Sequence, residues 1–246
     1  MAKSLAAAGG ALSTELKLPS IFQAPPSEVV GRSIAPYITF AHPKRADEWA
    51  KLTAKFGQVV EGDMYLIRRE GLVALALAKV SWMCCQQYWG EANAAGELLR
   101  ASFTETPKPF KEHIEAVALV YLEDCVIPVN VCFRSTKCPG AKVLNDALVE
   151  AATPVWAEKS SQHKETLVCV QPFARFYGLL SLSPQRTSKS TGLTYRTTTC
   201  AIHPTTPAEW RLLKAFSENE DATKMLNDAA QRYESRLNEI KSKVGK

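Results

Sequence analysis

The chain has 246 residues, with 30 Lys and Arg against 25 Asp and Glu and 46% hydrophobic residues. This composition is typical of a globular protein with a core of its own, and it excludes wholesale disorder, a collagen-like chain and a disulfide scaffold. No apolar run reaches the length of about 18 residues that a membrane-spanning helix needs, so we expect no membrane partner.

The cysteines favour a reducing compartment. There are seven of them, an odd number, and they include no Cys-x-x-Cys pair. Most lie in apolar, strand-like runs, where a thiol acts as a small hydrophobic group. We therefore expect a cytoplasmic protein. A structural zinc site needs about four ligands, usually in closely spaced pairs, and Cys132 and Cys138 with four scattered His do not offer them. We expect no metal and no cofactor.

The N-terminal segment differs from the rest. Residues 1–35 contain Pro19, Pro25 and Pro26 and show no apolar periodicity, and their first apolar stretch is too weak for a signal peptide. We interpret them as a mobile arm that could contact a neighbouring subunit. Residues 36–246 are expected to form a single α+β domain.

The first half of the chain predicts short strands and helices. Alternating apolar residues indicate strands, and spacing of three or four indicates helices. The expected elements, in chain order, are a strand at 36–40, a helix that ends at Gly57, strands at 64–69 and 72–80, and a short helix at 91–100.

The clearest strand signal lies in the middle of the chain. Residues 114–122 and 126–133 flank Glu123 and Asp124, which predicts a hairpin. Pro128 in the second strand suits an edge position or a bulge, since proline cannot donate to the ladder. An amphipathic helix is expected at 141–152.

The last third combines strands with helices. We expect strands at 166–182 and 195–202, joined by a loop at 183–194. Thr206 to Glu209 has the pattern of a helix-capping box, and a second helix from about 221 to 243 has an apolar stripe suited to docking on the body.

A short pattern occurs twice. His-Pro followed by Glu-Trp at the same spacing begins at His42 and again at His203, each time after an expected strand. The repeat indicates either duplicated strand–helix units or chance reuse of a good helix start. Overall, the pattern predicts an α+β fold: a mainly antiparallel sheet or partly closed, OB-like barrel, covered by three or four helices including a C-terminal one.

The positive charge is concentrated in one region. Nine Lys and Arg against four Asp and Glu lie between Arg134 and Arg196, whereas the remainder is balanced at 21 against 21. The loop at 183–194 contains cations, hydroxyls and no acid. A turn at 133–141, between a strand and a helix, could seat a backbone phosphate, or could be no more than a capped helix start.

Cations and aromatic rings on a hairpin are what a groove for single-stranded nucleic acid uses, because cations meet phosphates and bases stack on rings. The expected phosphate contacts are Arg134, Lys137, Arg175, Arg186, Lys189 and Arg196. The expected base-stacking rings are Phe173, Tyr177 and Tyr195. The alternative is that these rings face the core and the loop is a solvated hairpin tip.

No catalytic signature is present, so we predict no catalytic residues and a protein that is not an enzyme. The leading hypothesis is binding of single-stranded nucleic acid, DNA rather than RNA, largely without sequence preference. One alternative is an assembly protein that forms a homo-oligomer through its arm and C-terminal helix. Another is an enzyme without a recognisable motif.

Overall fold

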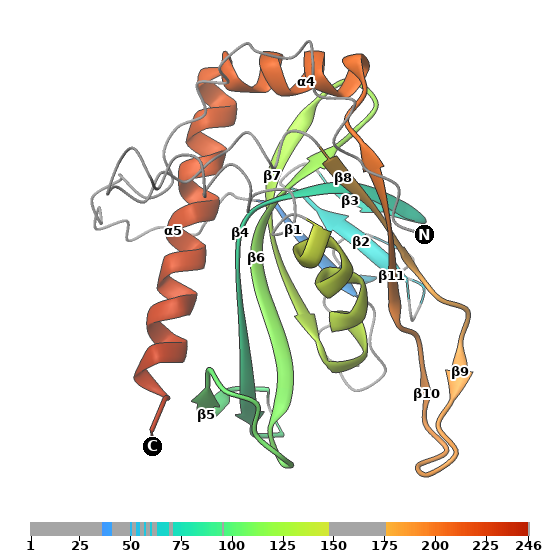
Figure 1. Ribbon diagram of the computed structural model, residues 1–246, viewed down its shortest axis with the longest axis vertical. Coiled ribbons are helices and arrows are strands. Elements are labelled where there is room, and N and C mark those ends of the chain that lie inside the picture. Colours follow the sequence, from blue (N-terminus) through green and yellow to red (C-terminus); the bar gives the residue numbers. More distant parts are fainter. Residues whose placement is uncertain are drawn as a thin grey trace.

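The computed structural model describes residues 36–40, 50, 53–54, 57, 60, 63–68, 71–94, 96–147 and 176–245. Within them a large sheet is covered by helices (Figure 1). The strands are β1 (Tyr37–Phe40), β2 (Met64–Ile67), β3 (Leu72–Ala74), β4 (Leu77–Ala92), β5 (Leu98–Ser102), β6 (Lys111–Tyr121), β7 (Val126–Arg134), β8 (Phe176–Leu182), β9 (Arg186–Thr187), β10 (Thr194–Tyr195) and β11 (Thr198–Pro204). The helices are η3 (Ser135–Lys137), a helical run at 138–147, α4 (Pro207–Ser217) and α5 (Glu220–Ser242).

The main sheet is mixed but mostly antiparallel. Its strand order is β11-β8-β4-β6-β7-β1-β2-β3, with β5 paired to β4, and β1 runs parallel to β7. The α+β class and the antiparallel character expected from the sequence are confirmed. Within the described residues no pairing joins β11 to β3, so the sheet is not closed, and the OB-like barrel is not confirmed.

The long hairpin of β6 and β7 is buried on both faces. Side chains of a strand alternate between the faces of its sheet. In β6, Ala116 and Ala118 belong to one core cluster with Val129 of β7, while Val117 and Leu119 belong to a second cluster beneath the C-terminal helices. The hairpin is confirmed, and its two apolar faces explain why it forms the centre of the sheet.

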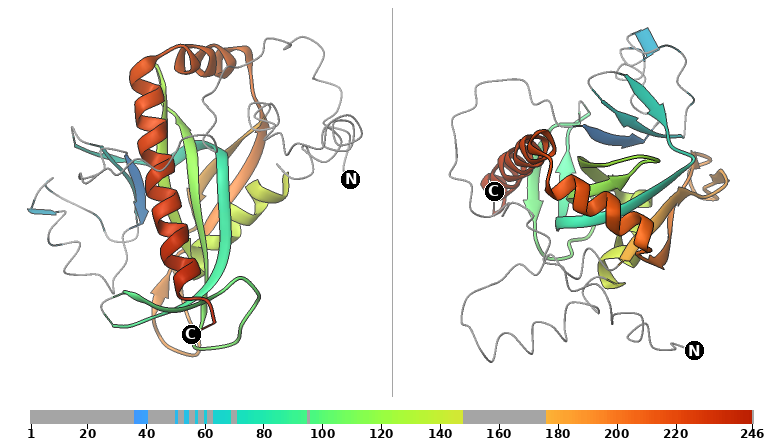
Figure 2. Two further views of the ribbon diagram at one scale, coloured as in Figure 1. Left: turned by 90° about the vertical axis from the view of Figure 1, so that its left-hand side faces the viewer. Right: turned by 90° about the horizontal axis from the view of Figure 1, so that it is seen from above.

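Helices cover both faces. Figure 2 shows α5 alongside the long strands, with β1 on one side of them and the helix at 138–147 on the other. Leu226, Ala229 and Ile240 of α5 are fully buried against the sheet, which confirms the docking expected from the apolar stripe. The capping box of Thr206 and Glu209 is also confirmed at the start of α4. Among the described residues, no helix is both long and apolar enough to cross a membrane.

The helix expected at 91–100 is wrong. β4 continues to Ala92, and β5 returns beside it after a turn. The Asn93 side chain binds the backbone and carboxylate of Glu97, and Gly96 has φ +85, which an L residue rarely adopts. Leu98 is buried against the end of α5. These tertiary contacts override the helix propensity of an Ala- and Glu-rich segment.

Some expectations lie outside the described residues. These include the arm at 1–35, most of the helix before Gly57, the first His-Pro pattern at 42 and the strand at 166–175. Gly57 itself has φ +88, and its N–H binds the Thr53 carbonyl at 2.9 Å, as expected of a glycine that ends a helix. The division into an arm and one domain stays a prediction.

Candidate functional site

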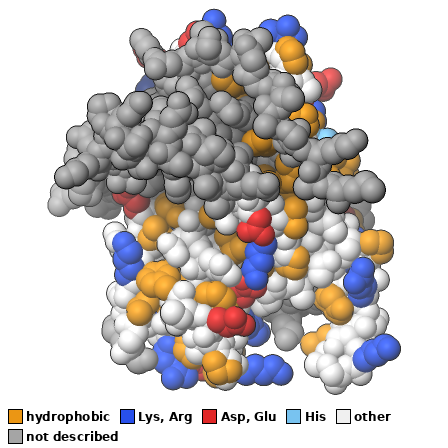
Figure 3. All heavy atoms as spheres, viewed as in Figure 1, with side chains coloured by type: hydrophobic (Ala, Val, Ile, Leu, Met, Phe, Trp, Pro, Cys, Tyr) orange, Lys and Arg blue, Asp and Glu red, His pale blue; other side chains and the backbone are white. Residues whose placement is uncertain are grey.

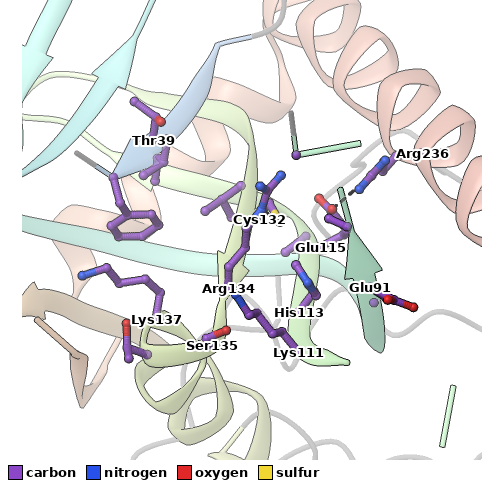
Figure 4. A pocket seen from close by; sticks show the side chains of 18 of the residues that line it. Thr39, Glu91, Lys111, His113, Glu115, Cys132, Arg134, Ser135, Lys137 and Arg236 are labelled. Carbon is purple, nitrogen blue, oxygen red and sulfur yellow. Dashed lines mark hydrogen bonds and ion pairs between the residues drawn. The ribbon is translucent and has the colours of Figure 1, made fainter. Parts of the chain in front are cut away.

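A large groove is bounded by β1, by the ends of β4, β6 and β7, by α5 and by the β9–β10 hairpin. Its volume is about 1720 Å³. Figure 4 shows cationic side chains from separate elements on its walls, among them Lys111, Arg134, Lys137 and Arg236. The groove is too large to be filled by one small molecule and continues across several elements, which suits an extended ligand.

Strand alternation places the polar side chains of β6 and β7 on the groove side. Lys111, His113 and Glu115 alternate along β6 and all line the groove. In the ladder His113 lies opposite Arg134, and Glu115 lies opposite Cys132. These residues therefore form two cross-strand rows on one surface.

The groove carries more positive than negative side chains. The cations on its lining are Lys111, Arg134, Lys137, Arg232 and Arg236. The carboxylates on its lining are Glu91, Glu115 and Glu239.

The carboxylates of the groove are already paired. Arg236 Nε lies 3.2 Å from Glu115 Oε1, and the same guanidinium pairs with Glu239. Glu91 pairs with Arg100, which lies outside the groove lining. Within the described part of the chain, the remaining four groove cations have no carboxylate at ion-pair distance.

Lys137 is the most buried of these cations. Only 6% of it is exposed, its Nζ donates to the Arg196 carbonyl at 2.6 Å, and Nζ lies 5.8 Å from the Phe40 ring centroid. Burial, and then the charge of Arg196, lower the pKa of Lys137 to about 8. Its ammonium is thus held in the groove wall without a neutralising carboxylate among the described residues.

Arg134 and Arg196 flank Lys137. Arg134 Nε lies 3.4 Å from Cys132 Sγ, and the guanidinium remains charged because Arg does not lose its proton in proteins. The Arg196 guanidinium lies 3.6 Å from Asp63. Arg134 therefore faces the groove without a counter-charge at ion-pair distance among the described residues, whereas Arg196 is partly neutralised.

Aromatic rings line the groove, and those of Tyr37 and Phe40 lie close to its cations. The guanidinium of Arg232 lies 5.0 Å from the Tyr37 ring centroid, which is a cation–π distance. Phe40, beside Lys137, and Tyr195, on the hairpin, also line the groove and are each half-buried. These rings leave part of their surface open to a ligand.

His113 occupies the floor of the groove. Its ring stacks on Tyr88, with centroids 4.9 Å apart and planes 13° apart. Burial lowers the pKa of His113 to about 3, and the charges of Arg134, Arg236 and Lys111 act in the same direction. The imidazole is therefore neutral at physiological pH.

Several residues expected from the sequence come together here. Arg134, Lys137 and Tyr195 line one groove, and the Arg196 backbone contacts Lys137. Arg186 and Lys189 are exposed on the β9–β10 hairpin but do not line the groove. In Figure 3 this hairpin forms a separate lobe at the lower right whose charged side chains are positive, whereas positive and negative side chains are mixed over the neighbouring surface.

The structure corrects the placement of Tyr177. Its ring is only 9% exposed, stacks on His203 with centroids 5.4 Å apart, and has Lys79 Nζ 5.3 Å from its centroid. It belongs to the core beneath α4 and is not available to stack on a base. Phe173 and Arg175 lie outside the described residues.

Sequence reasoning missed other residues of the groove. Lys111 and His113 precede the apolar part of β6, and their polar alternation was a usable signal. Arg232 and Arg236 are four residues apart on α5, a spacing that places them on one helix face. Their meeting with β6 depends on how α5 docks, which no local pattern reveals.

The described part of the groove presents charged and hydrogen-bonding side chains to a ligand. No group of three or more metal-ligating side chains occurs among the described residues. Burial raises the pKa of Cys132 to about 12, so its thiol stays protonated and a poor nucleophile.

Comparisons with known protein families, with curated proteins and with solved structures found no match for this chain.

Proposed function

We propose that this protein binds single-stranded nucleic acid in the groove, largely without sequence preference. Support comes from one arrangement: Lys111, Arg134, Lys137 and Arg232 line a single groove without carboxylate partners among the described residues, with aromatic rings close to the last two. Lys and Arg neutralise backbone phosphates, and aromatic faces stack bases at about 1–3 kcal/mol each.

An extended polyanion fits this arrangement better than a compact ligand. The cations come from β6, β7, η3 and α5, so they are distributed along the groove instead of converging on one point. A backbone with one charge per nucleotide can meet them in succession. The two exposed cations of the β9–β10 hairpin, Arg186 and Lys189, extend the same charge beyond the groove.

Under this proposal the long strands provide the binding surface that the sheet face provides in an OB-like fold. OB folds bind oligonucleotides across the face of a curved sheet and its flanking loops. Here the ends of β6 and β7 form the floor, and the β9–β10 hairpin is a flanking loop. A preference for DNA over RNA, a cytoplasmic location and a homo-oligomeric state belong to the same proposal.

The test is a titration with fluorescein-labelled deoxythymidine homopolymer, followed by fluorescence anisotropy at salt concentrations from about 50 to 200 mM. If the protein binds through phosphates, the logarithm of its affinity should fall steeply and linearly with the logarithm of the salt concentration. Lys111→Ala should lower the slope by about one unit. Lys214→Ala removes the same charge from an exposed position on α4, outside the groove lining, and should leave the slope unchanged.

Absence of binding at about 50 mM salt would overturn the proposal. Equal slopes for the wild type and Lys111→Ala would place the binding elsewhere on the molecule. Since Lys111 is exposed, its replacement should not impair folding, and circular dichroism of both variants checks this.

A further inference from the structure

Two buried acceptor atoms of the groove have no hydrogen-bond partner in the part of the chain that the structure describes. They are Nδ1 of His113 and Oδ1 of Asn130, and both residues line the groove. Buried polar atoms in folded proteins are nearly always paired, with protein or with a bound molecule. Two such atoms in one groove point to donor groups supplied by a ligand.

The environment identifies each atom as an acceptor. Asn130 Nδ2 donates to the Ala229 carbonyl at 2.8 Å, and a flipped amide would oppose two oxygens, so the unpaired atom is the oxygen. His113 is neutral and has a backbone hydrogen bond with Gly90; since Nδ1 has no partner among the described residues, we assign this bond to Nε2–H, which leaves a lone pair on Nδ1. Only 8% of His113 is exposed, and its ring is held by the stack on Tyr88.

The two acceptors lie along one line of the sheet. In the β6–β7 ladder His113 pairs with Arg134, and Asn130 pairs with Val117, four positions further along. At about 3.4 Å per residue the separation is roughly 14 Å, so one compact group cannot reach both. A ligand with repeated donors can. Unpaired nucleobases carry such N–H donors on their Watson–Crick edges.

We infer that a single strand lies in the groove with its bases toward the floor, so that base N–H groups donate to His113 Nδ1 and Asn130 Oδ1 while the phosphates face the cations. This rests on the proposed function and adds the orientation of the strand. Every base offers an N–H on this edge, so the contact selects unpaired bases without selecting a sequence. A duplex is excluded, because its base N–H groups are already bonded to the opposite strand.

The experiment compares homopolymers of deoxythymidine and N3-methyldeoxythymidine, which have the same phosphates but differ in the N–H donor. The wild type should bind the methylated polymer at least about tenfold more weakly, the equivalent of one lost hydrogen bond. A deoxyuridine homopolymer keeps the N3–H and lacks only the C5 methyl, so it should bind like deoxythymidine. His113→Phe preserves the stack on Tyr88 but removes the acceptor. The difference in its affinity for the deoxythymidine and N3-methyldeoxythymidine polymers should therefore be smaller than that of the wild type. Asn130→Leu should reduce the difference in the same way.

Each outcome decides the orientation. Equal wild-type affinity for the methylated and unmethylated polymers overturns it, while the steep salt dependence of both would leave the proposed function standing. The orientation is also overturned if N3-methylation weakens binding to both variants as much as it weakens binding to the wild type. The methyl group would then act at a place other than His113 and Asn130. If neither polymer binds, the proposed function fails together with the orientation. Should a variant not fold, the comparison of the three polymers on the wild type still decides.

Discussion

Lys137 should reduce the stability of the protein at neutral pH. Its pKa is about 8 in the folded chain, against 10.5 for an unperturbed lysine, because the ammonium is buried and lies near Arg196. A lowered pKa means that folding disfavours the charged form. Below pH 8 the lysine is charged in both states and the full penalty applies. Above pH 10.5 it is neutral in both states and the penalty is absent.

The magnitude follows from the difference between 10.5 and about 8. At about 1.4 kcal/mol per pH unit, the penalty is about 3 kcal/mol. Lys137→Met keeps an unbranched chain of similar size and removes the titration. The wild type should therefore gain stability relative to Lys137→Met by about 3 kcal/mol between pH 8 and 10.5, since the unfolded wild type binds more protons there.

Urea denaturation of both chains at intervals between pH 7 and 10.5 measures this difference. Other lysines, tyrosines and thiols titrate in both chains, so their effects cancel in the comparison. Lys214→Met removes a lysine at an exposed position and serves as the matched control, against which the change with pH for Lys137→Met is compared. A difference for Lys137→Met that does not change with pH would refute the reasoning, since it would mean that the buried ammonium carries no penalty.

Three further substitutions test the fold. Leu226 of α5 is fully buried, so Leu226→Ala should lower the free energy of unfolding by about 2–5 kcal/mol in urea denaturation, and an unchanged value would contradict the docking of α5. A Cβ at Gly178 would lie 2.5 Å from Cys200 Sγ, so Gly178→Ala should destabilise by about 1–3 kcal/mol, and adding Cys200→Ala should recover part of the loss. For Glu209, burial alone would raise the pKa, but hydrogen bonds from Thr206 and Lys79 outweigh it and lower the pKa to about 2. Glu209→Gln should therefore be less stable than the wild type at pH 7, with the gap closing as the pH falls from 4.5 to about 2; a gap that persists below pH 2 would contradict these bonds.

Local patterns predicted the elements whose signals are themselves local. The β6–β7 hairpin follows from two alternating runs on either side of Glu123 and Asp124, and the start of α4 follows from the hydroxyl, proline and carboxylate of its cap. In both cases the residues that specify the structure are neighbours in the sequence. The α5 stripe was equally readable, because three- and four-residue spacing requires no knowledge of the partner surface.

The pairing order and the orientation of side chains could not be predicted in this way. β1 pairs in parallel with β7, so that Tyr37 lies opposite Asn130, although the two residues are far apart in sequence. The alternation of side chains along β8 assigns Tyr177 to one face of the sheet. It cannot say whether that face is buried, because helices cover both faces of this sheet. The cations of the groove come from four elements, and their presence on one groove lining is a property of the fold alone.

Several local rules that this chain breaks are broken at the groove, although three of the five unpaired buried polar atoms among the described residues lie elsewhere. Lys137 is a buried cation without a carboxylate partner among the described residues, and His113 and Asn130 each contribute an unpaired buried acceptor. Ser135, also on the groove lining, has φ +49, the left-handed region that favours glycine. Each feature reduces stability, and such features persist mainly where function requires them. A strand whose phosphates meet Lys137 and whose bases meet the two acceptors would offset three of these penalties together. Binding of the deoxythymidine homopolymer should therefore raise the melting temperature of the wild type more than that of Lys137→Met.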